Sequence, residues 1–151
     1  MTKQYEYGTV SFFLDNKGWG RIKRDNGEKD AYFHRSRIVD RPHPILGRRI
    51  LTKKTRVRFV ANETSSGPEA LDVEMVKELG RVKFFRDNDG WGMIERDNEE
   101  ADAFVHRSHI LNDPKNYGRK RLIEGKRVRF KVLSDKKGPQ AVEIETVPNW
   151  F

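Results

Sequence analysis

The stretch "DNKGWGRIKRDNGEKDAYFHRS", residues 15–36, places a tryptophan between two glycines and ends in an aromatic pair followed by His-Arg-Ser. Residues 87–108, "DNDGWGMIERDNEEADAFVHRS", repeat this pattern. The match joins residues 8–39 to residues 80–111 at a constant shift, with about two thirds of the positions identical. After a one-residue slip it resumes, and "GPEALDVEMV" then corresponds to "GPQAVEIETV". Each copy spans roughly 70 residues, which indicates a duplicated small domain and not a solenoid of short repeats.

The boundary between the copies falls near "MVKELGRV", which gives a first domain at residues 1–77 and a second at residues 78–151. The last strand of the first copy is expected to end near residue 76, and the first strand of the second copy to begin at residue 80. Residues 77–79 would then form the whole link, which leaves little slack between the domains. The closing "VPNWF" can either dock on a domain or remain mobile.

The composition indicates a basic protein with a limited supply of apolar side chains. Of the 151 residues, 35% are hydrophobic and 36% charged, and the 11% aromatic content argues against a disordered chain. The net charge of +8 and the pI near 9.8 are typical of a nucleic-acid binder, although charge can also serve solubility alone. Residues 1–78 carry 16 Lys and Arg against 11 Asp and Glu, and residues 79–151 carry 15 against 12, so both copies share the excess.

The absence of cysteine excludes disulfides, zinc-thiolate sites and thiol nucleophiles, and it favours a reducing compartment. The N-terminal "MTKQYEYGTV" lacks the apolar core of a signal peptide, and no segment approaches the ~18 apolar residues of a membrane span. We therefore expect a cytoplasmic protein that acts as a monomer and has no membrane partner.

Short segments rich in aromatic and β-branched residues, bounded by Asn, Asp and Gly, predict β-strands in both copies. The expected strands are residues 8–13, 18–23, 30–34, 55–62 and 70–76, then residues 80–85, 90–95, 102–106, 126–133 and 141–147. Longer connections, residues 39–55 and 111–126, precede the fourth strand of each copy, and no long helix is indicated. The predicted fold class is all-β: two tandem five-stranded OB-fold barrels.

Alternation along the second and third strands predicts an aromatic outer face. With Ile22 and Phe33 inward, Trp19, Tyr32 and His34 turn outward. The corresponding outward residues of the second copy are Trp91, Phe104 and His106. The glycines beside Trp19 are expected to free the backbone and leave its ring open to a flat partner. Outward aromatics on a basic sheet form a stacking platform for bases, worth about 1–3 kcal/mol per base.

The combination of "GTVSFF", "KGWGRI" and "DAYFHRS", found in both copies, resembles the first strand and the two ribonucleoprotein motifs of cold-shock domains. These typically read G-K-V-K-W-F, K-G-F-G-F-I and V-F-V-H-F. The resemblance implies OB-type barrels that bind single-stranded RNA or DNA, and a role as an RNA chaperone or as a regulator of transcription or translation. It implies, as nucleic-acid-binding residues, Phe12, Trp19, Tyr32 and His34, their counterparts Phe84, Trp91, Phe104 and His106, the lysines Lys17 and Lys83, and the base-contacting Asp30 and Asp102.

The chain departs from the family pattern where contacts are expected. The departures are Arg21 and Met93 in place of a motif aromatic, Arg35 and Arg107 after the motif histidines, and Asp89 in place of the motif lysine. We include the three arginines and the methionine among the expected contacts and leave out Asp89. Arginine can stack and pair with phosphate, and methionine can make an apolar contact. The second copy is expected to bind more weakly. Alternation from Val10 directs Phe12 inward unless the strand contains a bulge.

Other charged positions keep two interpretations open. The arginines of the doubled "RVRF" can contact RNA, or they can pair across the sheet with acidic residues of the last strand. The cations of the long connections can contact phosphate or remain solvated; they are Arg48, Arg49, Lys53, Lys54, Arg119, Lys120 and Arg121. No calcium-loop pattern, zinc-ligand pair or catalytic signature is present, so we expect no metal, no cofactor and no enzymatic activity.

Two other functions remain open. In the first, one domain docks on a ribosome, an RNA polymerase or another protein while the other holds RNA; Asp89, Met93 and the acidic "NEEAD" loop favour this alternative. In the second, the chain is an accessory fragment of a nuclease or helicase, which the lack of a catalytic motif disfavours. A stacking face accepts both RNA and DNA, so the sequence does not choose between them.

Overall fold

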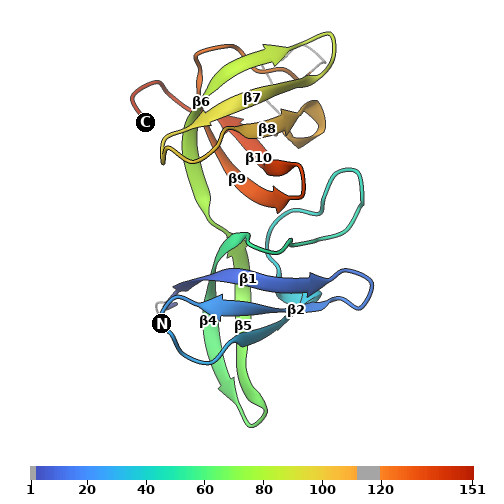
Figure 1. Ribbon diagram of the computed structural model, residues 1–151, viewed down its shortest axis with the longest axis vertical. Helices are drawn as coiled ribbons and strands as arrows, with labels where there is room; N and C mark the ends of the chain where they lie inside the picture. The colour runs from blue at the N-terminus through green and yellow to red at the C-terminus, as the bar shows by residue number, and fades with distance from the viewer. Residues whose placement is uncertain (1–2, 112–119) are drawn as a thin grey trace. The chain divides into compact units, whose positions relative to one another are not determined.

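The computed structural model describes residues 3–111 and 120–151, and the chain divides into two compact units, Met1–Val76 and Lys77–Phe151. In each unit five strands close into a barrel (Figure 1). The strands of the first barrel are β1 (Glu6–Leu14), β2 (Trp19–Arg24), β3 (Ala31–His34), β4 (Arg56–Thr64) and β5 (Gly67–Met75). Those of the second are β6 (Lys77–Arg86), β7 (Trp91–Arg96), β8 (Ala103–His106), β9 (Arg127–Asp135) and β10 (Gly138–Thr146).

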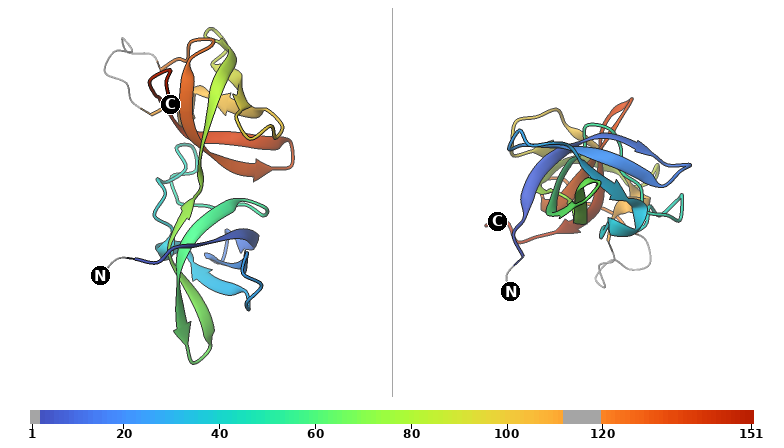
Figure 2. Two further views of the ribbon diagram at one scale, coloured as in Figure 1. Left: turned by 90° about the vertical axis from the view of Figure 1, so that its left-hand side faces the viewer. Right: turned by 90° about the horizontal axis from the view of Figure 1, so that it is seen from below.

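Both barrels have the same strand order, β1-β2-β3-β5-β4 in the first and β6-β7-β8-β10-β9 in the second. The third strand pairs with the fifth in parallel, and the other pairs are antiparallel. A 3₁₀ turn follows the third strand of each barrel, η1 (Arg35–Arg37) and η2 (Arg107–His109), and the described residues contain no α-helix. The predicted all-β fold of two OB-type barrels is confirmed, and Figure 2 shows the curvature of the strands from two further directions.

Alternating side chains fill the interior of each barrel. Ile22, Phe33, Val57 and Phe59 are fully buried in the first. Their counterparts in the second include Ile94, Val105 and Val128. The expected inward direction of Ile22 and Phe33 is therefore confirmed. Burying a side chain of this size contributes about 1.5–3 kcal/mol, so the core holds the backbone from which the outward residues project.

A bulge in the first strand of each barrel decides which way the following residues face. The pairing of β1 with β2 shifts between Val10 and Phe12, and that of β6 with β7 shifts between Val82 and Phe84. A bulge adds one residue to the strand, so residues beyond it exchange faces. Val10 lies in the core, whereas the Phe12 ring lies beside that of Trp19. The bulge that an outward Phe12 requires is thus present.

The two glycines beside Trp19 serve the backbone in different ways. Gly18 has a φ of +79°, which glycine adopts readily, and its N–H donates to the Leu14 carbonyl at 2.7 Å. Gly20 lies where β1 approaches β2 closely: a Cβ there would overlap the Phe12 carbonyl oxygen and stand 3.0 Å from Phe13 Cα. Close approach of the strands, and not the opening of the tryptophan ring, therefore explains this second glycine.

The expected link between the barrels is absent. β5 ends at Met75 and β6 begins at Lys77, so residues 77–79 belong to a strand. Lys77 lies opposite Lys131 and Leu79 opposite Arg129 on β9. The prediction of a three-residue link was wrong because it used only the local pattern of "MVKELGRV", whereas the strand is completed by pairing with a segment far along the chain.

The C-terminal segment docks on the second barrel. Arg127 Nε donates to the main-chain oxygen of Phe151 at 3.1 Å, and the Arg129 guanidinium lies 5.8 Å from the centroid of the Phe151 ring. Of the two alternatives for "VPNWF", the structure therefore shows docking of its last residue, while the Trp150 side chain remains 82% exposed.

Candidate nucleic-acid interface

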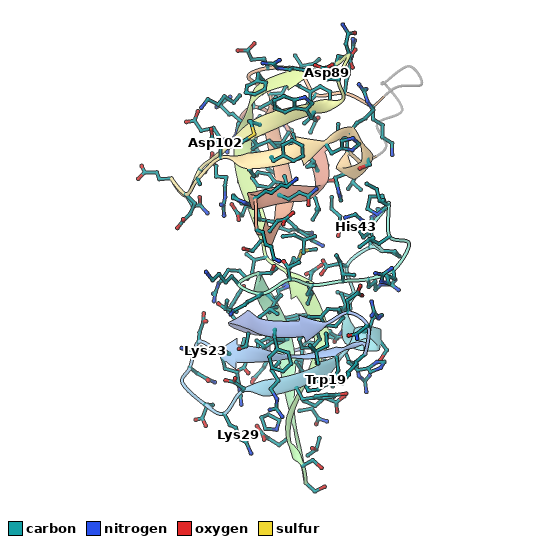
Figure 3. All side chains as sticks on the ribbon, turned by 45° about the vertical axis from the view of Figure 1, so that its right-hand side comes forward. Trp19, Lys23, Lys29, His43, Asp89 and Asp102 are labelled. Atoms are coloured by element: carbon teal, nitrogen blue, oxygen red, sulfur yellow. The ribbon has the colours of Figure 1, made fainter. Side chains whose placement is uncertain are left out.

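Three aromatic rings from three neighbouring strands form a continuous outer face on the first barrel, which we name the first platform: Phe12, Trp19 and Tyr32. The ring centroids of Phe12 and Trp19 are 5.4 Å apart with their planes at 78°, and those of Trp19 and Tyr32 are 5.7 Å apart at 32°. Strand pairing places Arg21 between Phe12 and Tyr32, and His34 opposite Trp19. The structure therefore brings these five predicted site residues together on the outside of the barrel, where Figure 3 labels Trp19.

The second barrel repeats this aromatic face and adds an arginine, Arg86, over its tryptophan ring. Its platform, the second platform, consists of Phe84, Trp91 and Phe104. The Phe84 and Trp91 centroids are 5.6 Å apart at 78°, and those of Trp91 and Phe104 are 5.8 Å apart at 24°. Met93 lies between Phe84 and Phe104 in the strand pairing. The guanidinium of Arg86 lies 5.1 Å from the Trp91 ring centroid, and the corresponding position of the first barrel is Leu14.

The two motif histidines are held by the 3₁₀ turns that follow them. The Ser36 N–H donates to Nδ1 of His34 at 3.1 Å, and the Ser36 hydroxyl lies 2.9 Å from the same nitrogen. His106 and Ser108 make the same pair of contacts at 3.1 and 2.8 Å. Because Nδ1 accepts a backbone hydrogen bond, the neutral ring carries its proton on Nε2. Each ring therefore presents an exposed donor at the edge of its platform.

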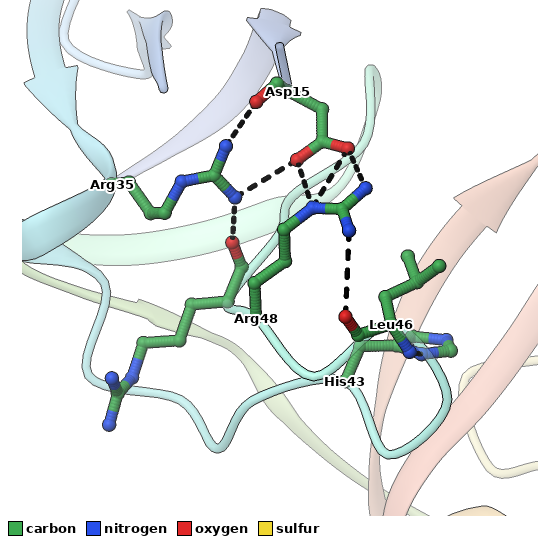
Figure 4. Close-up of polar contacts among 6 residues, drawn as sticks. Asp15, Arg35, His43, Leu46 and Arg48 are labelled. Atoms are coloured by element: carbon green, nitrogen blue, oxygen red, sulfur yellow. Dashed lines mark hydrogen bonds and ion pairs between the residues drawn. The ribbon is translucent and has the colours of Figure 1, made fainter. Parts of the chain in front are cut away.

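Arg35 and Arg107, both expected to contact nucleic acid, make their contacts within their own barrels. Arg35 donates to the Asp15 carboxylate at 2.9 Å, to the Asp15 carbonyl, and to the Arg49 carbonyl at 2.7 Å (Figure 4). Its guanidinium lies 5.2 Å from the Phe13 ring centroid. Arg107 makes the equivalent contacts with Asp87, Lys120 and Phe85. Since these contacts use the guanidinium donors, the geometry favours a structural role for both arginines.

Asp15 joins this arginine to the long connection before β4. Arg48 Nε donates to its two carboxylate oxygens at 2.9 and 3.1 Å, and Arg48 Nη2 donates to one of them as well (Figure 4). The Arg48 hydrogen bond, assisted by Arg35, lowers the pKa of Asp15 from 3.8 to about 2. Arg49 donates to the Asp40 carbonyl at 2.7 Å. The sequence left two roles open for the cations of the long connections, phosphate contact or solvation. Arg48 and Arg49 have intramolecular partners, and Arg119 lies outside the described residues.

The arginines of the doubled "RVRF" also have acidic partners. Arg58 pairs with Glu74 of β5 at 2.8 Å, and Arg129 pairs with Glu145 of β10. These are the cross-strand pairs that the acidic last strands predict. Arg56 and Arg127 instead reach the loops after β2 and β7, where they bind Asp25 and Asp97. Of the two interpretations, the structure favours ion pairing over RNA contact for these four residues.

A hollow of about 430 Å³ adjoins the first platform. Its lining comprises Arg21, Lys29, Asp30 and Tyr32, together with Thr64, Ser66, Gly67, Pro68 and Glu69 of the β4–β5 hairpin. The sequence did not reveal the hairpin's contribution, because it depends on the parallel pairing of Tyr32 with Glu69. Within the described residues the side chains of Arg21 and Asp30 have no ion pair or hydrogen bond, and Lys17 is exposed in the turn before β2.

The equivalent aspartate of the second barrel is paired. Lys83 Nζ lies 2.9 Å from Asp102 Oδ2. This hydrogen bond raises the pKa of Lys83 above its usual 10.5. The two predicted contacts Lys83 and Asp102 are therefore brought together as one ion pair. The position corresponding to Lys83 in the first barrel is Ser11, so no equivalent pair forms with Asp30.

Metal-ligand clusters and membrane-spanning helices are both absent from residues 3–111 and 120–151. No group of three His, Asp or Glu residues there could hold a metal ion. No helix in that part of the chain is long and apolar enough to cross a membrane.

The match to known families agrees with this geometry. The model of the 'Cold-shock' DNA-binding domain matches residues 6–76 and again residues 78–147. The chain belongs to the cold-shock domain family. This is a family of nucleic-acid-binding domains and not of enzymes. The resemblance seen in the motifs is thus confirmed for both barrels.

Individual relatives match one barrel or slightly more. Cold shock-like protein CspA of Vibrio cholerae is 44% identical over 68 residues, 45% of this chain and 91% of that protein. Cold shock-like protein CspE of Escherichia coli is 39% identical over 70 residues, 46% of this chain and 96% of that protein. Y-box-binding protein 3 of Homo sapiens is 34% identical over 84 residues, 54% of this chain and only 22% of that protein. The solved structure of drosophila Unr CSD456 covers 97% of this chain and 64% of its own, with 18% identity and a TM-score of 0.40.

Proposed function

We propose that the protein binds single-stranded RNA or DNA by stacking bases on the two platforms while neighbouring cations contact the phosphates. One observation carries the proposal: each barrel presents three adjacent aromatic rings outside its core, with centroids 5.4–5.8 Å apart. Such rings offer faces to bases of any identity, and each stacked base contributes about 1–3 kcal/mol. Arg21 and Lys29 supply positive charge in the hollow beside the first platform, and Lys17 is exposed two residues before Trp19.

This mode of binding provides a mechanism for an RNA chaperone without an energy source. A base can stack on a platform only after it has left its own helix. The protein therefore binds the open form of a weak hairpin, and mass action shifts the folding equilibrium toward that form. The same action on a transcript would alter termination or translation. A hairpin labelled with a fluorophore and a quencher should open in proportion to protein concentration, without nucleotide hydrolysis.

The two platforms are expected to differ in strength. Arg86 lies over the Trp91 ring, and a base that stacks there must displace the guanidinium. Asp89 places a negative charge where the first barrel has Lys17, and Met93 replaces Arg21. Each difference reduces the attraction of the second barrel for a polyanion or for a base. The first platform should therefore supply most of the affinity.

The proposal is tested by removing one platform at a time from the full chain. Trp19→Ala with Tyr32→Ala removes the first, and Trp91→Ala with Phe104→Ala removes the second. By fluorescence anisotropy with a labelled single-stranded oligonucleotide, the first pair of substitutions should weaken binding more than the second. Each lost ring should cost about 5- to 150-fold in affinity where it stacks a base.

The matched control is Trp150→Ala, because this tryptophan is 82% exposed and lies outside both platforms. It should leave the affinity unchanged. Dispersed NMR spectra of each variant would show that the barrels remain folded. Unchanged affinity in both platform variants would refute the proposed binding mode.

Docking on a ribosome, an RNA polymerase or another protein remains the alternative function for the second barrel. The observation that favours it is the acidic loop before β8, where Glu99 and Glu100 are exposed. A partner captured by the full chain after complete nuclease treatment would support docking. Loss of every partner on nuclease treatment would favour nucleic-acid binding by both barrels.

A further inference from the structure

The two barrels differ at the position of the first strand that, in the second barrel, contacts the aspartate expected to bind a base. In the second barrel Lys83 of β6 reaches Asp102 beside β8, with Nζ 2.9 Å from Oδ2. In the first barrel the same position of β1 is Ser11, whose side chain is too short to make this bond. Among the residues that the structure describes, no side chain donates to Asp30. One oxygen of the Asp102 carboxylate is therefore bound to Lys83, whereas both oxygens of the Asp30 carboxylate are open to a ligand.

Each aspartate lies two residues before the third-strand aromatic ring of its platform, Asp30 before Tyr32 and Asp102 before Phe104. Asp30 lines the hollow beside the first platform together with Arg21 and Tyr32. It directly precedes β3, which carries Tyr32, and Asp102 directly precedes β8, which carries Phe104. A base on either of these rings therefore has a carboxylate within the same surface region. The ion pair on Asp102 is itself accessible, since the Lys83 side chain is 55% exposed.

An open carboxylate selects among bases by the donors that it can accept. Its two oxygens accept hydrogen bonds and donate none, and they suit two parallel N–H groups. On the pairing edge only guanine offers two adjacent donors, N1–H and the N2 amine; the other bases place an acceptor beside each donor. Arg21, in the same hollow, supplies a donor for the neighbouring O6 acceptor of guanine.

The paired carboxylate does not discriminate in this way. With Oδ2 bound to Lys83, Asp102 presents one free acceptor oxygen next to an ammonium donor. Adenine, cytosine, guanine and uracil each have a donor next to an acceptor on the pairing edge. The pair of Lys83 and Asp102 can therefore satisfy any of them.

We propose that residue 11 or 83 sets the base selectivity of each barrel: Ser11 leaves Asp30 open and makes the first barrel prefer guanine, whereas Lys83 makes the second barrel tolerant. This inference rests on the proposed binding of single strands. It assigns the first barrel as the one that recognises sequence and the second as the one that adds affinity without a base requirement.

The test uses the full chain with one platform removed, so that each barrel is read separately. Trp91→Ala with Phe104→Ala leaves the first barrel, and Trp19→Ala with Tyr32→Ala leaves the second. The probes are three short oligouridylates: one unmodified, one with a single central guanosine and one with a central inosine. Inosine keeps N1–H and O6 but lacks the N2 amine, so it removes only the second donor.

The chain that retains the first barrel should bind the guanosine probe about fivefold or more tighter than the other two. Ser11→Lys should abolish this preference, and Lys83→Ser should create it in the chain that retains the second barrel. Both changes exchange residues already accepted at equivalent positions of the two barrels, and unfolding midpoints would show that each variant remains folded.

Equal binding of all three probes by the first barrel would overturn the inference while the proposed function stands. A guanosine preference that Ser11→Lys leaves intact would also overturn it. If none of the probes binds to either chain, the proposed function and the inference fail together.

Discussion

Gly20→Ala tests the link between the fold of the first barrel and its platform. The new Cβ would overlap the Phe12 carbonyl oxygen and stand 3.0 Å from both Phe13 Cα and Phe33 Cε1. That is about 0.5 Å inside the ~3.5 Å at which carbon atoms attract best. The obstacles include backbone atoms of β1, which cannot rotate away as the end of a side chain can. β1 must therefore move away from β2, and the paired rings of Phe12 and Trp19 must separate.

The expected cost lies at the upper end of the ~1–3 kcal/mol typical of overpacking. At about 1–3 kcal/mol per molar urea, a cost of that size lowers the unfolding midpoint by roughly 1 M or more. Two-dimensional NMR can follow the amides of Phe33 and Val105 through a urea titration, which reads the two barrels separately within the full chain. Only the transition reported by Phe33 should move.

Gly27→Ala is the matched control. Gly27→Ala adds the same methyl group to the first barrel, but in the loop after β2, where no atom lies within 4 Å of the new Cβ. Its φ of +78° still makes alanine cost about 1–2 kcal/mol. If Gly20→Ala destabilises the first barrel no more than this control does, close approach of β1 is not the reason for the glycine.

Three further predictions concern ion pairs and the second platform. The folded-state pKa of Asp15 is lowered from 3.8 to about 2, so its contribution to stability is present above pH 3.8 and is lost as pH falls through about 2. Asp15→Asn should therefore lower the urea midpoint of the first barrel near neutral pH, and this deficit should shrink in acid; a deficit independent of pH would contradict the network. Arg127→Ala should destabilise the second barrel by about 1–3 kcal/mol in urea unfolding, because it breaks two short bonds to Asp97 from a side chain that is 7% exposed. The equivalent Arg56→Ala should cost at most about 1 kcal/mol, because that pair is exposed; equal costs would refute the distinction. Arg86→Leu should raise the affinity of the second platform for single strands by about two- to fivefold in anisotropy titrations, because the guanidinium no longer competes with the base for the tryptophan ring; weaker binding would assign Arg86 to phosphate contact.

Features that depend on local periodicity could be predicted from the sequence. The repeat, the ten strands and the inward direction of Ile22 and Phe33 follow from alternation and turn residues. The outward direction of Trp19, Tyr32 and His34 follows from the same alternation. These residues lie on short strands, and the apolar residues next to them in sequence determine which face of the strand is buried. The aromatic part of the candidate site could therefore be predicted from the sequence alone.

Features that depend on pairing between distant segments could not be predicted. Whether Phe12 faces outward is decided by the bulge at residues 10–12, which is visible only in the register with β2. The ion pair of Lys83 and Asp102 joins β6 to the residue that precedes β8, so no local pattern indicates it. Arg35 was expected on the binding face because the motif places it after the histidine, but the fold brings Asp15 to its guanidinium. In each case the deciding contact joins residues of different strands or loops, which local alternation does not relate.

The most direct test of the central claim uses tryptophan fluorescence of the full chain carrying Trp150→Phe, in which Trp19 and Trp91 are the only reporters. A short pyrimidine-rich oligonucleotide is added first as a single strand and then as its duplex, each at two salt concentrations. If bases stack on the platforms, the single strand should quench strongly with a shallow salt dependence, and the duplex should quench little. Equal quenching by both forms, falling steeply with salt, would mean that charge alone drives binding and that the platforms do not stack bases.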